Sequence, residues 1–226
     1  MVDPDLFTRF ARLLAPHDGG LPLASGLCRA CVQVLGARGG ALTFAPVSVE
    51  QTTATTDDAS TKRMEDLQEV LGEGPGLLAF GLGRVVSTVV GPQATSAALP
   101  VFSSAVGMLG LSATVVAVPA RIGRHPLGAL TLYQEVDDVP IRPDAAQPLA
   151  DLSCAMLLAS STPLEQQWPD DSRRQRAIGM VIAQLRVTAS DALAAMRARA
   201  LARSCTLITV IDDVLGHRTS FDPSES

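Results

Sequence analysis

Two strand-like segments, separated by a link of only four residues, constrain the fold of this chain more than any other sequence feature. Residues 112–122 and residues 127–133 have the length and composition of strands. The link between them, Gly-Arg-His-Pro at residues 123–126, suits a hairpin turn. Strands joined by so short a link pair in antiparallel fashion, so we expect an antiparallel sheet.

The rest of the first 160 residues supplies more strands and several helices. A second hairpin is predicted from residues 39–45 and 47–56, with Pro46 near the turn, and residues 84–90 form another β-branched run. Helical spacing of apolar residues is found over residues 3–15, 21–36, 60–71, 100–109 and 144–159. We therefore predict an α+β fold in which helices flank an antiparallel sheet.

A glycine-rich segment, Gly-Glu-Gly-Pro-Gly at residues 72–76, interrupts this pattern. Three glycines and a proline do not continue a helix, so a loop is predicted here. Consecutive glycine amides can face an anion, but the segment lacks the lysine and the serine or threonine of a phosphate-binding loop. A structural turn is the favoured interpretation, and a ligand loop is the alternative.

The chain changes character near residue 160. Residues 160–171 contain two prolines and several polar residues, and only helical patterns follow them. We predict one domain over residues 1–160, a linker over residues 161–171, and an all-α three-helix domain over residues 172–221.

The balance of charge changes at the same place. Residues 1–171 carry 10 basic and 18 acidic side chains, a net of −8, whereas residues 172–226 carry 8 basic and 5 acidic ones, a net of +3. A basic module on an acidic body is a candidate for binding a polyanion. On charge alone, a solvated helical surface is an equal alternative.

Capping residues predict where the three C-terminal helices begin. Ser172 is expected to cap the first, Thr188 with Asp191 forms a capping box for the second, and Thr206 is expected to cap the third. Gly179 lies inside the first helix, where glycine costs about 1 kcal/mol relative to alanine. Something should therefore approach the backbone there: a neighbouring helix is the commoner cause, and an RNA strand is the alternative.

Cysteine and histidine usage argues against a metal or redox centre. Cys28 and Cys31 form a C-x-x-C motif, but residues three apart share one face of a helix, so two buried core residues are favoured over a redox pair or half of a metal site. The three histidines are scattered along the chain. We expect no metal site and, because no nucleophile–base pair is apparent, no enzymatic activity.

Nothing in the sequence suggests insertion into a membrane. No apolar run approaches the roughly 20 residues that cross a bilayer. The acidic start, Met1 to Asp5, is unlike a secretory signal. We expect a soluble, cytoplasmic protein with no membrane contact.

The order of elements over about residues 20–160 resembles a GAF domain, a common sensor of small molecules or of redox state. The closest local matches are residues 67–75, LQEVLGEGP, and residues 128–133, GALTLY. The resemblance is more specifically to the GAF half of actinobacterial GAF–ANTAR regulators. It implies that the domain senses a small-molecule ligand or another signal. It names no cofactor, and we assign no cofactor and no cofactor-binding residue.

The last 55 residues resemble an ANTAR domain along nearly its full length. The matching residues are Ala177–Val181, Gln184–Leu185, Val187–Thr188, Asp191–Leu193, Met196–Ala198, Ala200, Leu207, Val210, Asp213–Val214, Arg218 and Phe221. The resemblance implies transcription antitermination. Such domains, typically as dimers, bind paired stem-loops in a nascent leader RNA and prevent the terminator hairpin from forming. RNA and a second copy of the chain are therefore the expected partners.

Arginines of this module are the expected RNA contacts, because they bind phosphates or stack on loop bases, while small helix residues let RNA come close. The expected RNA-binding residues are Arg173, Arg176, Gly179, Arg197, Arg199, Arg203 and Arg218. Arg199 and Arg203 are four residues apart, so they share one face of the second helix, where both are expected to be exposed.

Two other functions compete with RNA-binding regulation. A sensor that acts through protein–protein contacts would carry a bundle too degenerate to bind RNA. Ile178, where many ANTAR domains have lysine, and the modest charge of +3 favour this alternative. An enzyme ranks last: some GAF domains reduce methionine sulfoxide with paired cysteines, but Cys28 and Cys31 lie on an early helix away from any predicted pocket.

Overall fold

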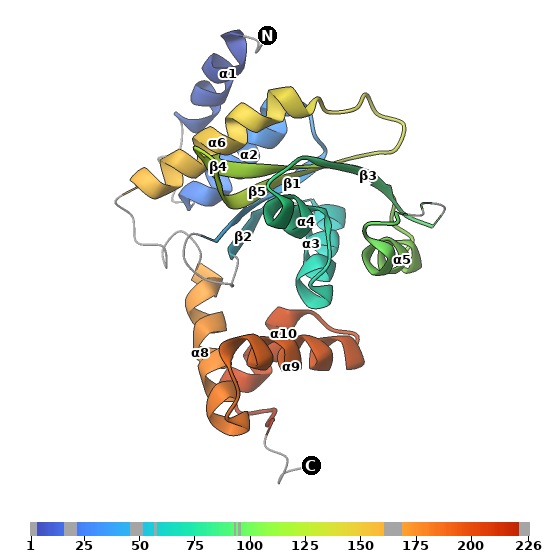
Figure 1. The fold of residues 1–226 in the computed structure, drawn as a ribbon, viewed down its shortest axis with the longest axis vertical. Helices are drawn as coiled ribbons and strands as arrows, with labels where there is room; N and C mark the ends of the chain where they lie inside the picture. Colours follow the sequence, from blue (N-terminus) through green and yellow to red (C-terminus); the bar gives the residue numbers. More distant parts are fainter. Residues whose placement is uncertain are drawn as a thin grey trace.

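The computed structural model describes residues 4–15, 22–45, 52–56, 58–92, 94, 96–160 and 169–221. Figure 1 shows two parts stacked along the long axis of the molecule. We call residues 4–160 the sheet domain and residues 169–221 the helical bundle. The part of the chain that is described therefore follows the predicted order of an α+β region and an all-α region.

An antiparallel five-stranded sheet forms the centre of the sheet domain, with the strand order β2-β1-β5-β4-β3. The strands are β1 (Gly39–Phe44), β2 (Thr52–Thr55), β3 (Val86–Val90), β4 (Ala113–Ile122) and β5 (His125–Gln134). Ile122 pairs with His125, so the β4–β5 hairpin turns through two residues only. The turn is tighter than the four-residue link expected from sequence. Gly123 has a φ of 62°, a backbone conformation that favours glycine.

Helices cover both faces of this sheet (Figure 1). One face packs against α2 (Leu23–Leu35) and α6 (Pro143–Ala159), with α1 (Pro4–Leu14) packed on α2, and the other face packs against α3 (Ala59–Leu71), α4 (Pro75–Leu82) and α5 (Pro100–Met108). Side chains alternate between these layers along β5. Leu132 is buried in the cluster with α2 and α6, whereas Tyr133 is buried in the cluster with α3 and α5.

The glycine-rich segment departs from the sequence prediction. Gly72 ends α3 in the left-handed conformation with φ 64°, as a helix-ending glycine should. Pro75 and Gly76 do not belong to a loop; they are the first two residues of α4, a helix that was not predicted. Proline is tolerated at this position because the first helical N–H has no intrahelical partner and the fixed φ of proline suits a helix.

The helical bundle consists of α8 (Pro169–Leu185), α9 (Ala189–Ala202) and α10 (Leu207–Leu215). Two of the predicted caps are confirmed: Thr188 accepts a hydrogen bond from the Asp191 amide at 3.2 Å, and Thr206 accepts one from the Thr209 amide at 3.3 Å. The third is wrong, because α8 begins before Ser172 and includes it. Residues 161–168 of the predicted linker and residues 47–51 of the predicted second hairpin lie outside the described residues.

The bundle docks on α3 of the sheet domain. The apolar faces of α8, α9 and α10 form the hydrophobic core of the bundle, and Val70 of α3 is buried in the same cluster. Met64 of α3 belongs instead to the core beneath the sheet. One helix thus contributes to two hydrophobic cores.

No single helix in the described ranges is long and apolar enough to cross a bilayer. Residues Ser172–Leu185 and Ala189–Ala202 pass such a test only when taken together, and they meet at an angle of 99°.

Candidate functional site

The residues predicted to contact RNA do not form one open surface. Three of the arginines form ion pairs with acids of α10: Arg173 with Asp212, and both Arg203 and Arg218 with Asp213. The two bonds to Asp213 measure 2.8 and 2.9 Å, and the hydrogen bond from Arg203 contributes most to the lowered pKa of this carboxyl. These arginines stay 45–60% exposed. Their charge is therefore accessible but partly neutralised within the bundle.

Arg199 is not exposed as predicted. Its guanidinium carbon lies 3.9 Å from the centre of the Phe221 ring, and its Nη1 atom donates to the Ser220 carbonyl at 2.7 Å. The Phe221 amide in turn donates to the side chain of Gln184 at 2.9 Å. Arg199 thus holds the C-terminal segment against the bundle. The sequence prediction failed because helical periodicity places Arg199 and Arg203 on one face but does not show what else packs there.

Arg176 and Gly179 lie on an exposed side of α8. A Cβ atom placed on Gly179 would meet no atom within 4 Å. The neighbouring helix that seemed the commoner explanation of this glycine is therefore absent from the described part of the chain. Arg176 has no ion-pair partner among the described residues. Together the two residues give α8 an open, cationic strip with accessible backbone.

Arg197 lies at the junction between the bundle and the sheet domain and is partly buried there. Its Nη1 atom is 3.4 Å from the position that a Cβ of Gly72 would occupy. Burial lowers the pKa of this guanidinium, because desolvation disfavours the charged form. Of the residues predicted for RNA, Arg197 is the one that the sheet domain covers.

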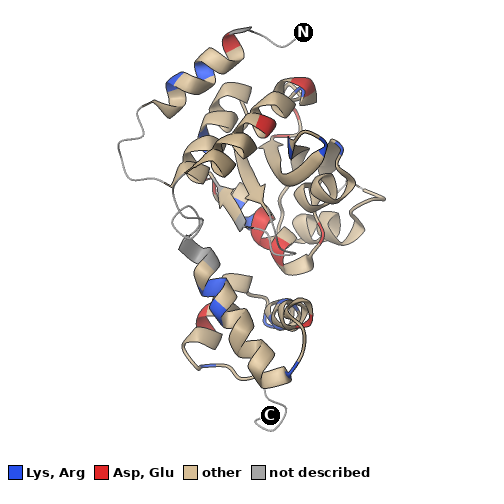
Figure 2. Ribbon diagram, turned by 60° about the vertical axis from the view of Figure 1, so that its left-hand side comes forward, with Lys and Arg blue, Asp and Glu red and all other residues tan. Residues whose placement is uncertain are grey.

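Acidic and basic side chains face each other across this junction. Figure 2 shows acidic segments of the sheet domain on the side that is nearest the bundle. Glu69 of α3 forms an ion pair with Arg174 of α8, and both side chains are largely shielded from solvent, at 27% and 17% exposure. Neither residue was predicted to be functional. The sequence gives no signal for this pair, because its members are 105 positions apart.

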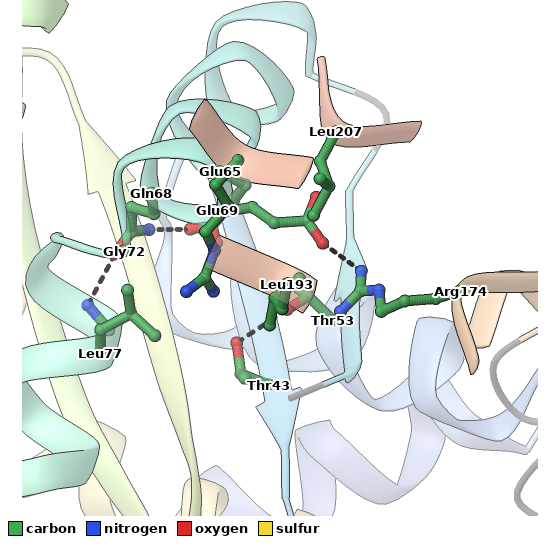
Figure 3. Close-up of a pocket in the computed structure, with 12 residues that line it drawn as sticks. Thr43, Thr53, Glu65, Gln68, Glu69, Gly72, Leu77, Arg174, Leu193 and Leu207 are labelled. Atoms are coloured by element: carbon green, nitrogen blue, oxygen red, sulfur yellow. Dashed lines mark hydrogen bonds and ion pairs between the residues drawn. The ribbon is translucent and has the colours of Figure 1, made fainter. Parts of the chain in front are cut away.

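A cavity of about 180 Å³ lies at the junction. Figure 3 shows its lining, with Arg174 reaching Glu69 and with Thr43 facing Thr53. The walls come from both parts of the molecule: Thr43, Thr53, Glu65, Gln68, Glu69, Gly72, Gly76 and Leu77 from the sheet domain, and Arg174, Leu193, Arg197 and Leu207 from the bundle. The cavity is therefore a place where the sheet domain and the bundle can bind the same molecule.

A hydrogen-bond network fixes the sheet-domain wall. The Tyr133 hydroxyl donates to Glu65 at 2.6 Å, and the Gln68 amide nitrogen donates to Glu65 at 2.8 Å and to Tyr133 at 2.9 Å. Burial of the Glu65 carboxyl raises its pKa to about 7, because desolvation disfavours the charged form. Glu65 can therefore gain or lose a proton near neutral pH.

The glycine-rich segment supports this wall. The Gly76 amide donates to the Gln68 side chain at 3.0 Å, and a Cβ on Gly76 would lie 2.6 Å from the hydroxyl of Thr131. Glu73 accepts hydrogen bonds from the amides of Val101 and Phe102, both at 2.9 Å, and so satisfies the start of α5. These contacts fix the start of α4 and of α5, and Gly72 and Gly76 of the segment also line the cavity.

The paired cysteines lie in the core. Cys28 and Cys31 are fully buried on α2, and the Cys31 sulfur lies 3.6 Å from the Ser153 hydroxyl. Burial raises the pKa of the Cys31 thiol to about 12, so the reactive thiolate is disfavoured. Neither sulfur lines the junction cavity. Within the described residues, no group of three or more His, Cys, Asp or Glu side chains could hold a metal ion.

No protein-family model and no curated protein matches the chain. Solved structures that it is similar to include GAF domains. The GAF domain/HD domain protein from Geobacter sulfurreducens is 16% identical with a TM-score of 0.46, over 62% of this chain and 95% of that one. The GAF domain from an Acinetobacter phosphoenolpyruvate-protein phosphotransferase is 10% identical with a TM-score of 0.43, over 72% and 100%.

A chromophore-binding domain of a Stigmatella aurantiaca bacteriophytochrome is 9% identical, with a TM-score of 0.43. The match covers 70% of this chain and 61% of that domain, so the chain spans less than two thirds of its length.

Proposed function

We propose that the chain is a signal-responsive, RNA-binding transcription antitermination regulator. Residues 1–160 are its GAF-type sensor domain, residues 161–171 its linker, and residues 172–221 its ANTAR-type RNA-binding domain. The observation that supports this best is the open strip on α8, where Arg176 is exposed and nothing described lies within 4 Å of a Cβ on Gly179. A phosphate backbone can approach such a strip closely, and no helix among the described residues competes for it.

The ion-paired arginines extend this strip. A surface ion pair contributes only about 0–1 kcal/mol, so Arg173, Arg203 and Arg218 can exchange their carboxylate partners for RNA phosphates at little cost. Each exchange also releases counterions from the RNA, which makes binding dependent on salt. Arg199 acts indirectly in this account, by holding the C-terminal segment in place through Phe221.

The junction supplies a means of control. Docking of the bundle on α3 buries Val70 and covers Arg197, one of the expected RNA contacts. RNA and the sheet domain therefore compete for this arginine. A signal that weakens the docking raises RNA affinity, and a signal that strengthens the docking lowers it.

A homodimer is part of the proposal, because leader RNAs of this class present two stem-loops and linked sites raise affinity through effective concentration. The α6 helix can serve both the core and a dimer interface. Its buried side includes Leu149 and Leu157, while Leu158 is 48% exposed. Phe7 of α1, at 41% exposure, adds a second apolar side chain for a partner to cover.

A second function is favoured by a specific observation. Arg199 is committed to Phe221 and Ser220, and Arg197 is covered by the sheet domain, so two expected RNA contacts are engaged within the chain. This arrangement suits a sensor that acts through protein–protein contacts and does not bind RNA. The two functions predict that different molecules co-purify with the protein from its host.

Sequencing of the RNA that co-purifies with the full chain distinguishes RNA-binding regulation from a function through protein–protein contacts. The antitermination proposal expects enrichment of leader segments that contain two adjacent stem-loops, and loss of that enrichment with Gly179→Leu. An RNA profile that matches a mock purification, together with a stable protein partner, supports the second function instead.

A further inference from the structure

The size of the junction cavity limits what it can hold. Its volume of about 180 Å³ corresponds to roughly six water molecules at about 30 Å³ each. Drug-sized ligands and cofactors need pockets of roughly 300–1,000 Å³. In this conformation the cavity therefore suits a small molecule.

One cation of the cavity, Arg197, forms no ion pair among the described residues, although the charge of nearby Glu69 favours its protonated form. Arg197 lines the cavity, and no carboxylate of the described residues lies within ion-pair distance of its guanidinium. Its Nε atom is buried and has no hydrogen-bond partner among them. The nearby Glu69 is already bonded to Arg174. A partly buried, unpaired charge is unfavourable, so an anion in the cavity would supply what Arg197 lacks.

The remaining lining indicates the kind of anion. Leu77 and Leu193 give the cavity apolar walls that suit a short carbon chain. The Thr43 and Thr53 hydroxyls, 3.2 Å apart, add neutral polar groups. The planar fork of a guanidinium matches the two oxygens of a carboxylate. Inorganic phosphate would satisfy the charge but would leave the apolar walls without contacts.

We propose that the junction cavity binds a small organic carboxylate, whose charged end pairs with Arg197 and whose carbon chain contacts Leu77 and Leu193. The inference names a ligand class for the sensor role proposed above and rests on that role, but it does not depend on RNA binding. Because the cavity walls belong to both parts of the molecule, the ligand stabilises the docked arrangement by mass action.

Isothermal titration calorimetry on the full chain tests the proposal, with lactate, malate and isobutyrate as probes. Lactamide serves as the uncharged analogue and inorganic phosphate as the anion without a carbon chain. The matched variants are Arg197→Gln in the cavity and Arg176→Gln on the exposed side of α8. We expect at least one carboxylate to bind, with affinity about ten-fold or more weaker in Arg197→Gln and unchanged in Arg176→Gln. Lactamide and phosphate should bind more weakly than that carboxylate.

Circular dichroism checks whether Arg197→Gln still folds. A second variant tests the cavity independently of that result. Leu77→Trp fills the cavity from the α4 side without changing its charge, and it should also abolish binding. The proposal is overturned if no carboxylate probe binds at millimolar concentration, if phosphate binds as well as the carboxylates, or if binding survives both cavity variants. RNA binding, measured separately on the same samples, shows whether the proposed function stands or fails independently.

Discussion

Glu69 of α3 and Arg174 of α8 form an ion pair that joins the sheet domain to the helical bundle. The pair lies beside Val70, which is buried in the core of the bundle. A charge contact and an apolar contact thus act side by side on one helix. The same helix carries Glu65 and Gln68, which bond to Tyr133 in the sheet. A change at the sheet therefore has a short physical route to the bundle.

Loss of the ion pair should loosen the docking. Glu69→Gln leaves Arg174 without its carboxylate, so the bundle separates more readily and Arg197 becomes available to RNA. We expect RNA affinity to rise about two- to ten-fold, which corresponds to roughly 0.5–1.4 kcal/mol. Asp66→Asn is the matched control, because it removes one negative charge from α3 without breaking an ion pair across the junction. An equal gain in both variants would indicate a general charge effect rather than release of the bundle.

The apolar contact can be tested by a separate substitution. Val70→Ala removes two buried carbon atoms and should destabilise the docked protein by about 1–2 kcal/mol, since each buried CH₂ group contributes about 0.8 kcal/mol. The same substitution at Val139, which is 86% exposed, should have little effect. Thermal unfolding checks both variants. Equal stability of the two would mean that Val70 does not hold the bundle on α3.

Arg199 should behave as a stabilising residue. A cation–π contact contributes about 0.5–1 kcal/mol and a hydrogen bond about 1 kcal/mol, so Arg199→Ala should destabilise the bundle by roughly 1–2 kcal/mol. Arg203→Ala removes only a surface ion pair and should destabilise the bundle less than Arg199→Ala does. Chemical denaturation followed by circular dichroism measures the difference. If Arg199→Ala and Arg203→Ala have the same denaturation midpoint, Arg199 does not hold the C-terminal segment as proposed.

The stability of the sheet domain should depend on pH through Glu65. Its folded pKa of about 7 lies above the ordinary value of 4.5, so the folded state binds more protons than the unfolded state between these values. Stability contributed by protonated Glu65 is complete below about pH 4.5 and is lost as the pH rises through 7. Glu65→Gln stays neutral and can still accept a hydrogen bond from Tyr133, so it should remove about 1–2 kcal/mol of this dependence. Unfolding curves at pH 5 and at pH 8 provide the test, and an identical pH dependence in wild type and variant would contradict it.

Local sequence signals predicted much of the fold. Thr188 and Thr206 cap their helices because capping depends on neighbours only three residues away. The β4–β5 hairpin was predictable for the same reason, since its turn lies between two strongly patterned strands. The α4 helix was missed because glycine and proline normally end helices, and here Pro75 begins one.

Contacts between distant segments account for most of what the sequence did not predict. The partners of Arg199 come from the C-terminal segment, and the contact between Glu69 and Arg174 joins different parts of the molecule. Val70 looked like one more residue of an apolar stripe, yet it faces a second core. Periodicity shows that a helix has a buried face, but it does not show how many partners cover that face.

A salt titration of the full chain with a two-hairpin leader RNA, repeated with Arg176→Ala and Gly179→Leu, tests whether α8 binds RNA. We predict that wild-type affinity falls steeply with salt, with a slope of about −0.7 per phosphate contact for single-stranded RNA. Arg176→Ala should flatten the slope by about one such contact. Gly179→Leu should weaken binding through bulk alone and leave the slope unchanged, with circular dichroism confirming that both variants fold. If wild type binds no RNA, or if both variants bind as tightly as wild type with the same slope, α8 is not an RNA-binding surface and the account is contradicted.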